Sequence, residues 1–74
     1  MLNLCDAKTN KQYVIEGFEN LPTNILRRLC DLGLTKGQSV MVSSRSLLKK
    51  ALLIQVRGYL LSLKADIAKG VKVK

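Results

Sequence analysis

The side chains that could perform acid–base or nucleophilic chemistry are few and dispersed. The 74-residue chain has no histidine, and its five acidic residues lie in different segments, with no spacing that would pair two carboxylates. General acid–base catalysis and an activated nucleophile both need such neighbouring groups. The segment GLTKG, residues 33–37, also fails as a phosphate loop, because it follows a predicted helix and no Gly-Lys-Ser/Thr comes after it. We therefore predict no enzymatic activity.

The two cysteines are the remaining reactive groups. Cys5 and Cys30 stand 25 positions apart with no histidine anywhere in the chain. A protein metal site normally takes three or four ligands at recognisable spacing, so we predict neither a metal site nor a cofactor. Two cysteines are also too few for the disulfide framework of a small secreted domain, which favours a reducing compartment. We expect both thiols to be buried or half-buried.

Composition limits the classes of partner. Thirteen lysines and arginines against five acids give a formal net charge of +8, which favours acidic partners. With Tyr13, Phe18 and Tyr59 as the aromatic residues, no stacking platform for nucleic-acid bases is evident, and we expect no specific nucleic acid. The longest apolar run, residues 51–54, is far shorter than the roughly 20 residues of a membrane-spanning helix. No signal-peptide core is present, so we expect a soluble, cytoplasmic protein.

A few short helices and strands must position these side chains. The periodicity of apolar residues along the sequence predicts where these elements lie. Residues 12–18 alternate as a strand, with Tyr13 and Ile15 on one face. Residues 22–32 carry an apolar helical stripe, with Gly33 placed to end the helix in a left-handed conformation. A second strand starts at residue 38, after Gly37. The predicted helical stripe consists of Ile25, Leu26, Leu29 and Leu32.

The second half of the sequence predicts a hairpin, a helical turn and a last strand. Residues 43–50 are polar and basic and are expected to form a loop, and residues 52–63 alternate around a turn near Arg57 and Gly58. A helical turn over residues 64–69 stops at Gly70, and residues 71–74 form the last strand. We predict one domain, residues 1–74, mainly β, in which four or five strands form a small, strongly bent barrel whose closure removes exposed edges.

One motif resembles a known family. The pattern R-L-x-x-L-G-L-x-x-G-x-x-V is similar to the signature of the FeoA family, small cytoplasmic partners of the bacterial ferrous iron transporter FeoB, and IQVRGYLLSLKADIAKGVKV, residues 54–73, is similar to that family's closing segment. This chain differs by Asn10 where the family usually has Gly, by Lys64 where Arg is common, and by a 43–50 loop without Pro or Gly. The motif residues are Arg28, Leu29, Leu32, Gly33, Leu34, Gly37 and Val40.

The resemblance implies a fold and a role. It implies an SH3-like β-barrel with one α-helix and a short helical turn. It also implies a non-catalytic accessory role in ferrous iron uptake, through binding to the cytoplasmic GTP-binding region of a FeoB-type transporter. The protein would then be peripheral to the membrane through its partner, with weak self-association open. The alternatives are a stand-alone regulatory domain like the C-terminal domain of DtxR-type repressors, or a weak nucleic-acid-binding barrel.

Exposed cations and two unexplained leucines make up the candidate interaction surface. Arg27 and Arg28 lie near the C-terminal half of the predicted helix, and Arg27 can pair with Asp31 one turn on. Leu47 and Leu48, within the basic loop, either anchor the loop in the core or form an apolar knob inside a basic rim. We predict docking through the helix face around Arg27 and through the 43–50 loop. The candidate residues are Arg27, Arg28, Arg45, Leu47, Leu48, Lys49 and Lys50.

Overall fold

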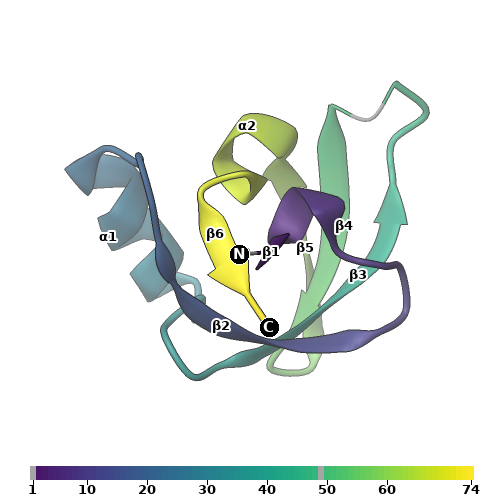
Figure 1. Ribbon diagram of the computed structural model, residues 1–74, viewed down its shortest axis with the longest axis horizontal. Coiled ribbons are helices and arrows are strands. Elements are labelled where there is room, and N and C mark those ends of the chain that lie inside the picture. The colour runs from purple at the N-terminus through teal and green to yellow at the C-terminus, as the bar shows by residue number, and fades with distance from the viewer. Residues whose placement is uncertain (1, 49) are drawn as a thin grey trace.

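The computed structural model describes residues 2–48 and 50–74, so the predicted interaction residue Lys49 lies outside the described residues. The elements follow an order close to the one expected from the sequence (Figure 1). They are β1 (Leu2–Asn3), the 3-10 helix η1 (Leu4–Asp6), β2 (Gln12–Phe18), α1 (Thr23–Asp31), β3 (Ser39–Arg45), β4 (Ala51–Val56), β5 (Tyr59–Lys64), α2 (Ala65–Ala68) and β6 (Val71–Val73).

The described strands form one antiparallel sheet in the order β1-β6-β2-β3-β4-β5. The sheet bends strongly: β2 and β3 curve along the bottom and right of the view, β6 and β5 lie on the inside of this curve, and α2 caps one end (Figure 1). The predicted mainly β, strongly bent architecture with one long α-helix and a short helical turn is confirmed. Within the described residues the hydrogen-bonded order ends at β1 and at β5, so bending, rather than a continuous ladder, encloses the core.

The core follows the alternation predicted for the strands. Tyr13 and Ile15 on β2 are buried, whereas Val14 and Glu16 between and beyond them are only half-buried. Because successive strand residues point to opposite faces, β2, β3, β4 and β6 each supply two or three side chains to the interior, and β5 supplies one. The largest fully buried side chains are Leu4, Ile15, Leu29, Leu34, Val40, Val42, Leu52, Ile54, Val56, Val71 and Val73.

The end of α1 has the left-handed glycine conformation that the sequence predicted. Gly33 has φ of 91°, its N–H donates to the Cys30 carbonyl at 3.0 Å, and the Leu34 N–H donates to the Leu29 carbonyl at 2.9 Å. This pair of bonds is a Schellman motif, which satisfies carbonyls that the helix leaves free. Leu29 and Leu34 are both fully buried, so the motif also turns the chain back into the core.

Two tight turns also match the sequence. Arg57 and Gly58, between β4 and β5, have φ of 51° and 85°, as a two-residue hairpin with a right-handed twist requires. Asn10, before β2, has φ of 64°. Asparagine tolerates this left-handed region better than most residues, so this turn forms without a glycine.

Two segments differ from the sequence-based expectation. β3 continues through Arg45, so the predicted 43–50 loop begins only after residue 45. Pairing of Ser44 with Leu53 and of Arg45 with Leu52, beyond a register shift, holds these polar residues in the sheet. The N-terminal segment, for which we predicted no structure, forms β1 and η1. It is ordered because it pairs with β6 from the far end of the chain.

Candidate functional site

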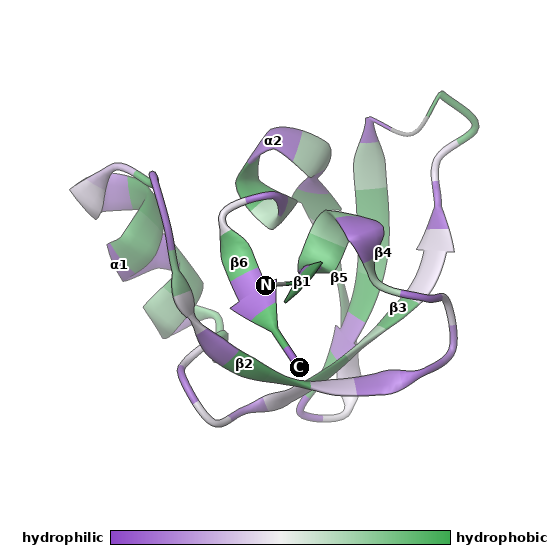
Figure 2. Ribbon diagram, in the orientation of Figure 1, coloured by the Kyte–Doolittle hydropathy of each residue, from purple (hydrophilic) through white to green (hydrophobic). Residues whose placement is uncertain are grey.

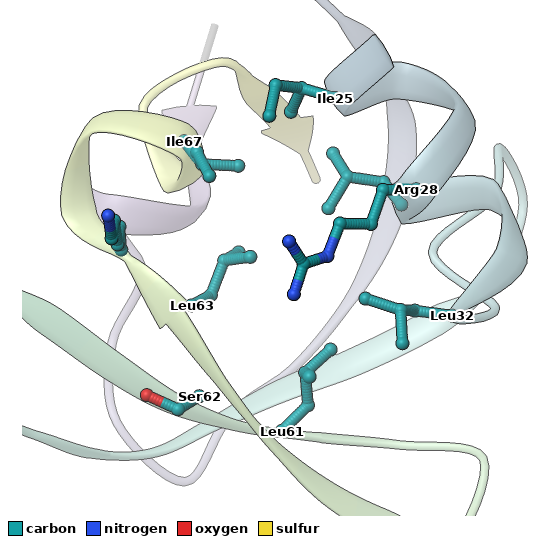
Figure 3. A pocket seen from close by; sticks show the side chains of 9 residues that line it. Ile25, Arg28, Leu32, Leu61, Ser62, Leu63 and Ile67 are labelled. Carbon is teal, nitrogen blue, oxygen red and sulfur yellow. The ribbon is translucent and has the colours of Figure 1, made fainter.

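A groove lies between α1 and the sheet edge at β5, and it is the candidate interaction site. Its volume is about 250 Å³. Side chains of α1 form one wall, and β5 with α2 forms the other (Figure 3). The lining residues are Ile25, Arg28, Leu29, Leu32, Leu61, Ser62, Leu63, Lys64 and Ile67.

The wall formed by α1 follows from helical spacing. Residues 25, 28, 29 and 32 are separated by three or four positions, so they share one helix face. Leu29 is buried in the core, whereas Ile25 is partly buried against it. Leu32, the C-cap residue, is half-buried as well. The helix therefore contacts the core through part of its apolar face and presents the remainder to the groove.

The wall formed by β5 is an edge strand. Among the described strands β5 pairs only with β4, so one side of its backbone is free of a strand partner. Four consecutive residues, 61–64, line the groove from this strand. An unpaired strand edge presents N–H and C=O groups that can bond to an added strand. The groove thus joins apolar side chains with backbone donors and acceptors.

The charge of the groove is positive. The Arg28 side chain extends from α1 into the space between Leu61 and Leu63 (Figure 3), and Lys64 lines the same groove. No acidic residue is among its lining residues, and neither of the ion pairs formed by described residues involves these two cations. An arginine fork without a carboxylate partner suits a ligand that brings one.

The two neighbouring arginines are in different positions. Both arginines are exposed, but Arg28 lines the groove and Arg27 is not among the lining residues. The pairing of Arg27 with Asp31 suggested by the sequence is not formed among the described residues. The two arginines therefore differ in their place relative to the groove and not in their exposure.

The loop residues predicted for interaction separate into two groups. Arg45 holds the N-terminal segment in place, because its guanidinium donates to the Cys5 carbonyl at 2.7 Å and to the Ala7 carbonyl. Leu47 is 98% exposed and Leu48 is 73% exposed. Of the two alternatives for these leucines, anchoring in the core is wrong, and the exposed apolar knob remains. Lys50 is exposed at the base of the same loop.

The two cysteines differ in exposure. Cys5 is half-buried as expected, but Cys30 is exposed, so the prediction for its thiol is wrong. Cys30 lies on the side of α1 that turns away from Leu29. In residues 2–48 and 50–74 no three side chains among cysteine, aspartate and glutamate come together as potential metal ligands.

The sequence reasoning missed the groove itself. Arg28 sat in the family motif, and its position one turn from Ile25 and Leu32 could have placed it on the apolar face. The other wall depended on which strand lies at the sheet edge, and nothing in the alternation of residues 59–64 distinguishes an edge strand from a central one.

Comparison with known proteins decides the family. The FeoA domain family matches residues 2–74 of this chain. The chain belongs to the FeoA domain family. FeoA domains are small accessory domains associated with ferrous iron transport, and the expectation drawn from the motif is confirmed at this level. No curated protein matches the sequence significantly.

Solved FeoA structures have the same fold. The FeoA protein of Stenotrophomonas maltophilia, solved in complex with zinc, is 30% identical, with a TM-score of 0.84, over 100% of this chain and 91% of that one. It is described as an SH3-domain protein that could act as an activating factor of bacterial ferrous iron transport. The FeoA protein of Chlorobium tepidum is 25% identical, with a TM-score of 0.90, over 97% of this chain and 68% of that one.

The fold is also found within a longer protein. The zinc-bound protein ScaR matches with a TM-score of 0.86 and 22% identity, over 100% of this chain and 36% of that chain, which shows a common fold. In the part of this FeoA-family chain that the structure describes, no helix has the length and apolarity needed to span a bilayer.

Proposed function

We propose that the protein is a non-catalytic accessory protein of bacterial ferrous iron uptake that binds the cytoplasmic GTP-binding region of a FeoB-type transporter. Membership of the FeoA domain family over residues 2–74 supports the process. The activating role described for the Stenotrophomonas maltophilia relative supports an action through a partner. The partner itself is our proposal.

The groove beside α1 is the observation that carries this proposal. It is lined mostly by leucine and isoleucine, it runs along the free edge of β5, and it holds an arginine without a carboxylate. A partner segment in extended conformation could pair with β5 through its backbone and place apolar side chains against α1. A carboxylate in that segment could accept charged hydrogen bonds from Arg28, and the bound segment would shield that pair from water.

The two other classes of function have less support. The likeness to ScaR, at 22% identity, concerns the fold and does not favour a repressor-type regulatory role. Nucleic-acid binding has the charge of +8 in its favour. It lacks a cluster of exposed aromatic residues, since Tyr13 is buried and Phe18 is half-buried. We therefore place both behind the transporter partner.

A charge-reversal pair on α1 tests the docking surface. Arg28→Glu should weaken binding of the FeoB cytoplasmic region by about tenfold or more, because it repels the proposed carboxylate inside the groove. Arg27→Glu, one position away with the same charge change, should have a much smaller effect, since Arg27 does not line the groove. NMR titration of the labelled protein with the FeoB cytoplasmic region measures both, and the shifts should concentrate on residues 25–32 and 60–67.

Three outcomes would count against this arrangement. No shifts with the FeoB region would reject the partner. Loss of binding with Arg27→Glu alone would move the interface to the outer face of α1, as the sequence had suggested. Equal loss with both variants would indicate attraction by net charge rather than a specific groove.

A further inference from the structure

We propose that the loop between β3 and β4 is a membrane-contact tip, which inserts Leu47 and Leu48 into the surface of an anionic lipid bilayer. The inference goes beyond the proposed transporter partner and does not depend on it. It rests on the exposure of the two leucines, on the hydrogen bonds that close the base of the loop, and on the charges around that base.

The two leucines are the most exposed large apolar residues among those described. Leu47 is 98% exposed and Leu48 is 73% exposed, against 56% for Leu60 and 40% for Tyr59. They lie together at the end of the loop that projects beyond β3 and β4, where the ribbon carries its apolar colour (Figure 2). Nothing in the described chain covers them, so their hydration is relieved only by something outside the fold.

The base of the loop is fixed by hydrogen bonds. The Ser46 N–H donates to the Ala51 carbonyl at 2.9 Å, which closes the loop across the two strands. The Ser46 hydroxyl oxygen accepts from the Lys50 N–H at 2.9 Å and from the Ala51 N–H at 3.1 Å. These bonds order the two ends of the loop before any contact, which lowers the conformational entropy lost on binding.

The surroundings of the tip are cationic. No acidic residue occurs between Asp31 and Asp66, so β3, β4, β5 and their connecting loops contain none. A concavity of about 640 Å³ beside the start of β4 is lined by Lys50, Lys64 and Lys69, with Asp66 as its one acid. Lysines near an anionic bilayer are attracted to its negatively charged surface. The loop therefore combines an apolar tip with lysines around its base.

A bilayer fits this shape better than a protein pocket does. The leucine pair is a small convex end, and a protein partner would need a hollow matched to it, whereas a bilayer interior accepts apolar side chains without a preformed hollow. Two leucines alone would bind weakly, and the lysines supply the second signal that stable but reversible membrane association needs. The same chemistry would align a protein partner of a membrane transporter with the bilayer.

Vesicle binding by the full chain tests the tip. We expect the wild type to float with vesicles of phosphatidylglycerol mixed with phosphatidylcholine, and not with pure phosphatidylcholine vesicles. Leu47→Ser/Leu48→Ser should reduce the partition coefficient by about tenfold or more, because it removes the apolar contribution. Lys50→Gln/Lys69→Gln should reduce both binding and its salt dependence. Leu60→Ser is the matched control, since Leu60 is exposed on β5, near the turn at the opposite end of β4.

A fluorescent reporter locates the contact. The chain contains no tryptophan, so Leu47→Trp gives a single indole signal. On anionic vesicles its emission should shift to shorter wavelength and be quenched by brominated lipid, while Leu60→Trp should show neither effect. Circular dichroism melts confirm that each variant folds, and replacement of a side chain that is 98% exposed should leave the melting temperature unchanged.

Defined results would overturn the inference. It fails if the wild type does not bind the anionic vesicles, if the double serine variant binds them as well as the wild type, or if both indole positions respond equally. Loss of binding to the FeoB region in the absence of lipid, with no vesicle binding, would assign the tip to a protein partner. A change of sedimentation coefficient in the double serine variant, again with no vesicle binding, would assign it to a second copy of the chain.

Discussion

At the level of single residues, the two glycines that end helices, Gly33 and Gly70, have different structural roles. Gly33 ends α1 with a positive φ, as its position predicted. Gly70 ends α2 as predicted, but its φ is not positive, and its role is close approach. A Cβ there would lie 2.7 Å from the Glu19 carbonyl oxygen and 2.6 Å from Leu21 Cγ. The Glu19 N–H also donates to the Gly70 carbonyl at 2.8 Å, so the two segments cannot separate without breaking that bond.

Gly70→Ala should therefore lower the free energy of unfolding by about 2 kcal/mol, the cost typical of an overpacked buried site. Gly17→Ala is the matched control, because a Cβ at Gly17 would have nothing within 4 Å and its φ is not positive. Its effect should stay within about 0.5 kcal/mol. Urea unfolding followed by circular dichroism measures both, and equal effects of the two substitutions would contradict the close-approach explanation.

At the scale of elements, the N-terminal segment is held by a strand far from it in the sequence. β1 pairs with β6, and Leu4 of η1 is fully buried. Arg45 at the end of β3 adds two hydrogen bonds from its guanidinium to the carbonyls of Cys5 and Ala7. Bonds from a charged donor to partly buried carbonyls contribute more than neutral ones. Arg45 therefore stabilises the element that the sequence reasoning did not predict.

Arg45→Met, which keeps an unbranched side chain and removes the donors, should lower the free energy of unfolding by about 1 to 2 kcal/mol. Amide hydrogen exchange should accelerate most at Asp6 and Ala7, whose N–H groups bond within this segment. Arg27→Met removes an exposed cation with no ion pair among the described residues and should change neither quantity. Unchanged exchange at Asp6 and Ala7 in Arg45→Met would show that the strand pairing alone holds the segment.

At the scale of the whole molecule, repulsion among like charges outweighs attraction. The net charge is +8, and two ion pairs form among the described residues, Lys72 with Glu19 at 3.4 Å and Lys74 with Glu16 at 3.5 Å. Each pair has an exposed partner, and such pairs contribute about 0 to 1 kcal/mol. The excess of cations extends over the whole chain and opposes the compact state.

Raising sodium chloride from about 20 mM to about 300 mM should therefore raise the melting temperature by a few degrees, because the Debye length shortens and repulsion is screened. Lys36→Glu lowers the net charge by two, to +6, at an exposed position, and should reduce this increase. Scanning calorimetry at several salt concentrations measures both. A melting temperature that falls with salt would mean that the ion pairs outweigh the repulsion.

The sequence by itself determined the features that depend on near neighbours. Alternation over residues 12–18 and 52–63 placed the strands and their buried faces, and the leucine stripe before Gly33 placed α1 and its end. The turn at Arg57 and Gly58 was also predicted from the sequence. Period and turn chemistry act within a few residues, so a single chain segment contains the information. The motif around Gly33 also indicated the family.

Only the tertiary structure decided which surfaces the elements leave open. The groove exists because α1 lies beside β5, and β5 is an edge because β1, and not β5, pairs with β6. The difference between Arg27 and Arg28 depends on that packing, as does the structural use of Arg45. The exposure of Leu47 and Leu48 was decided in the same way, since burial depends on whether distant segments cover a side chain. Such contacts join residues far apart in the sequence, and no local pattern records them.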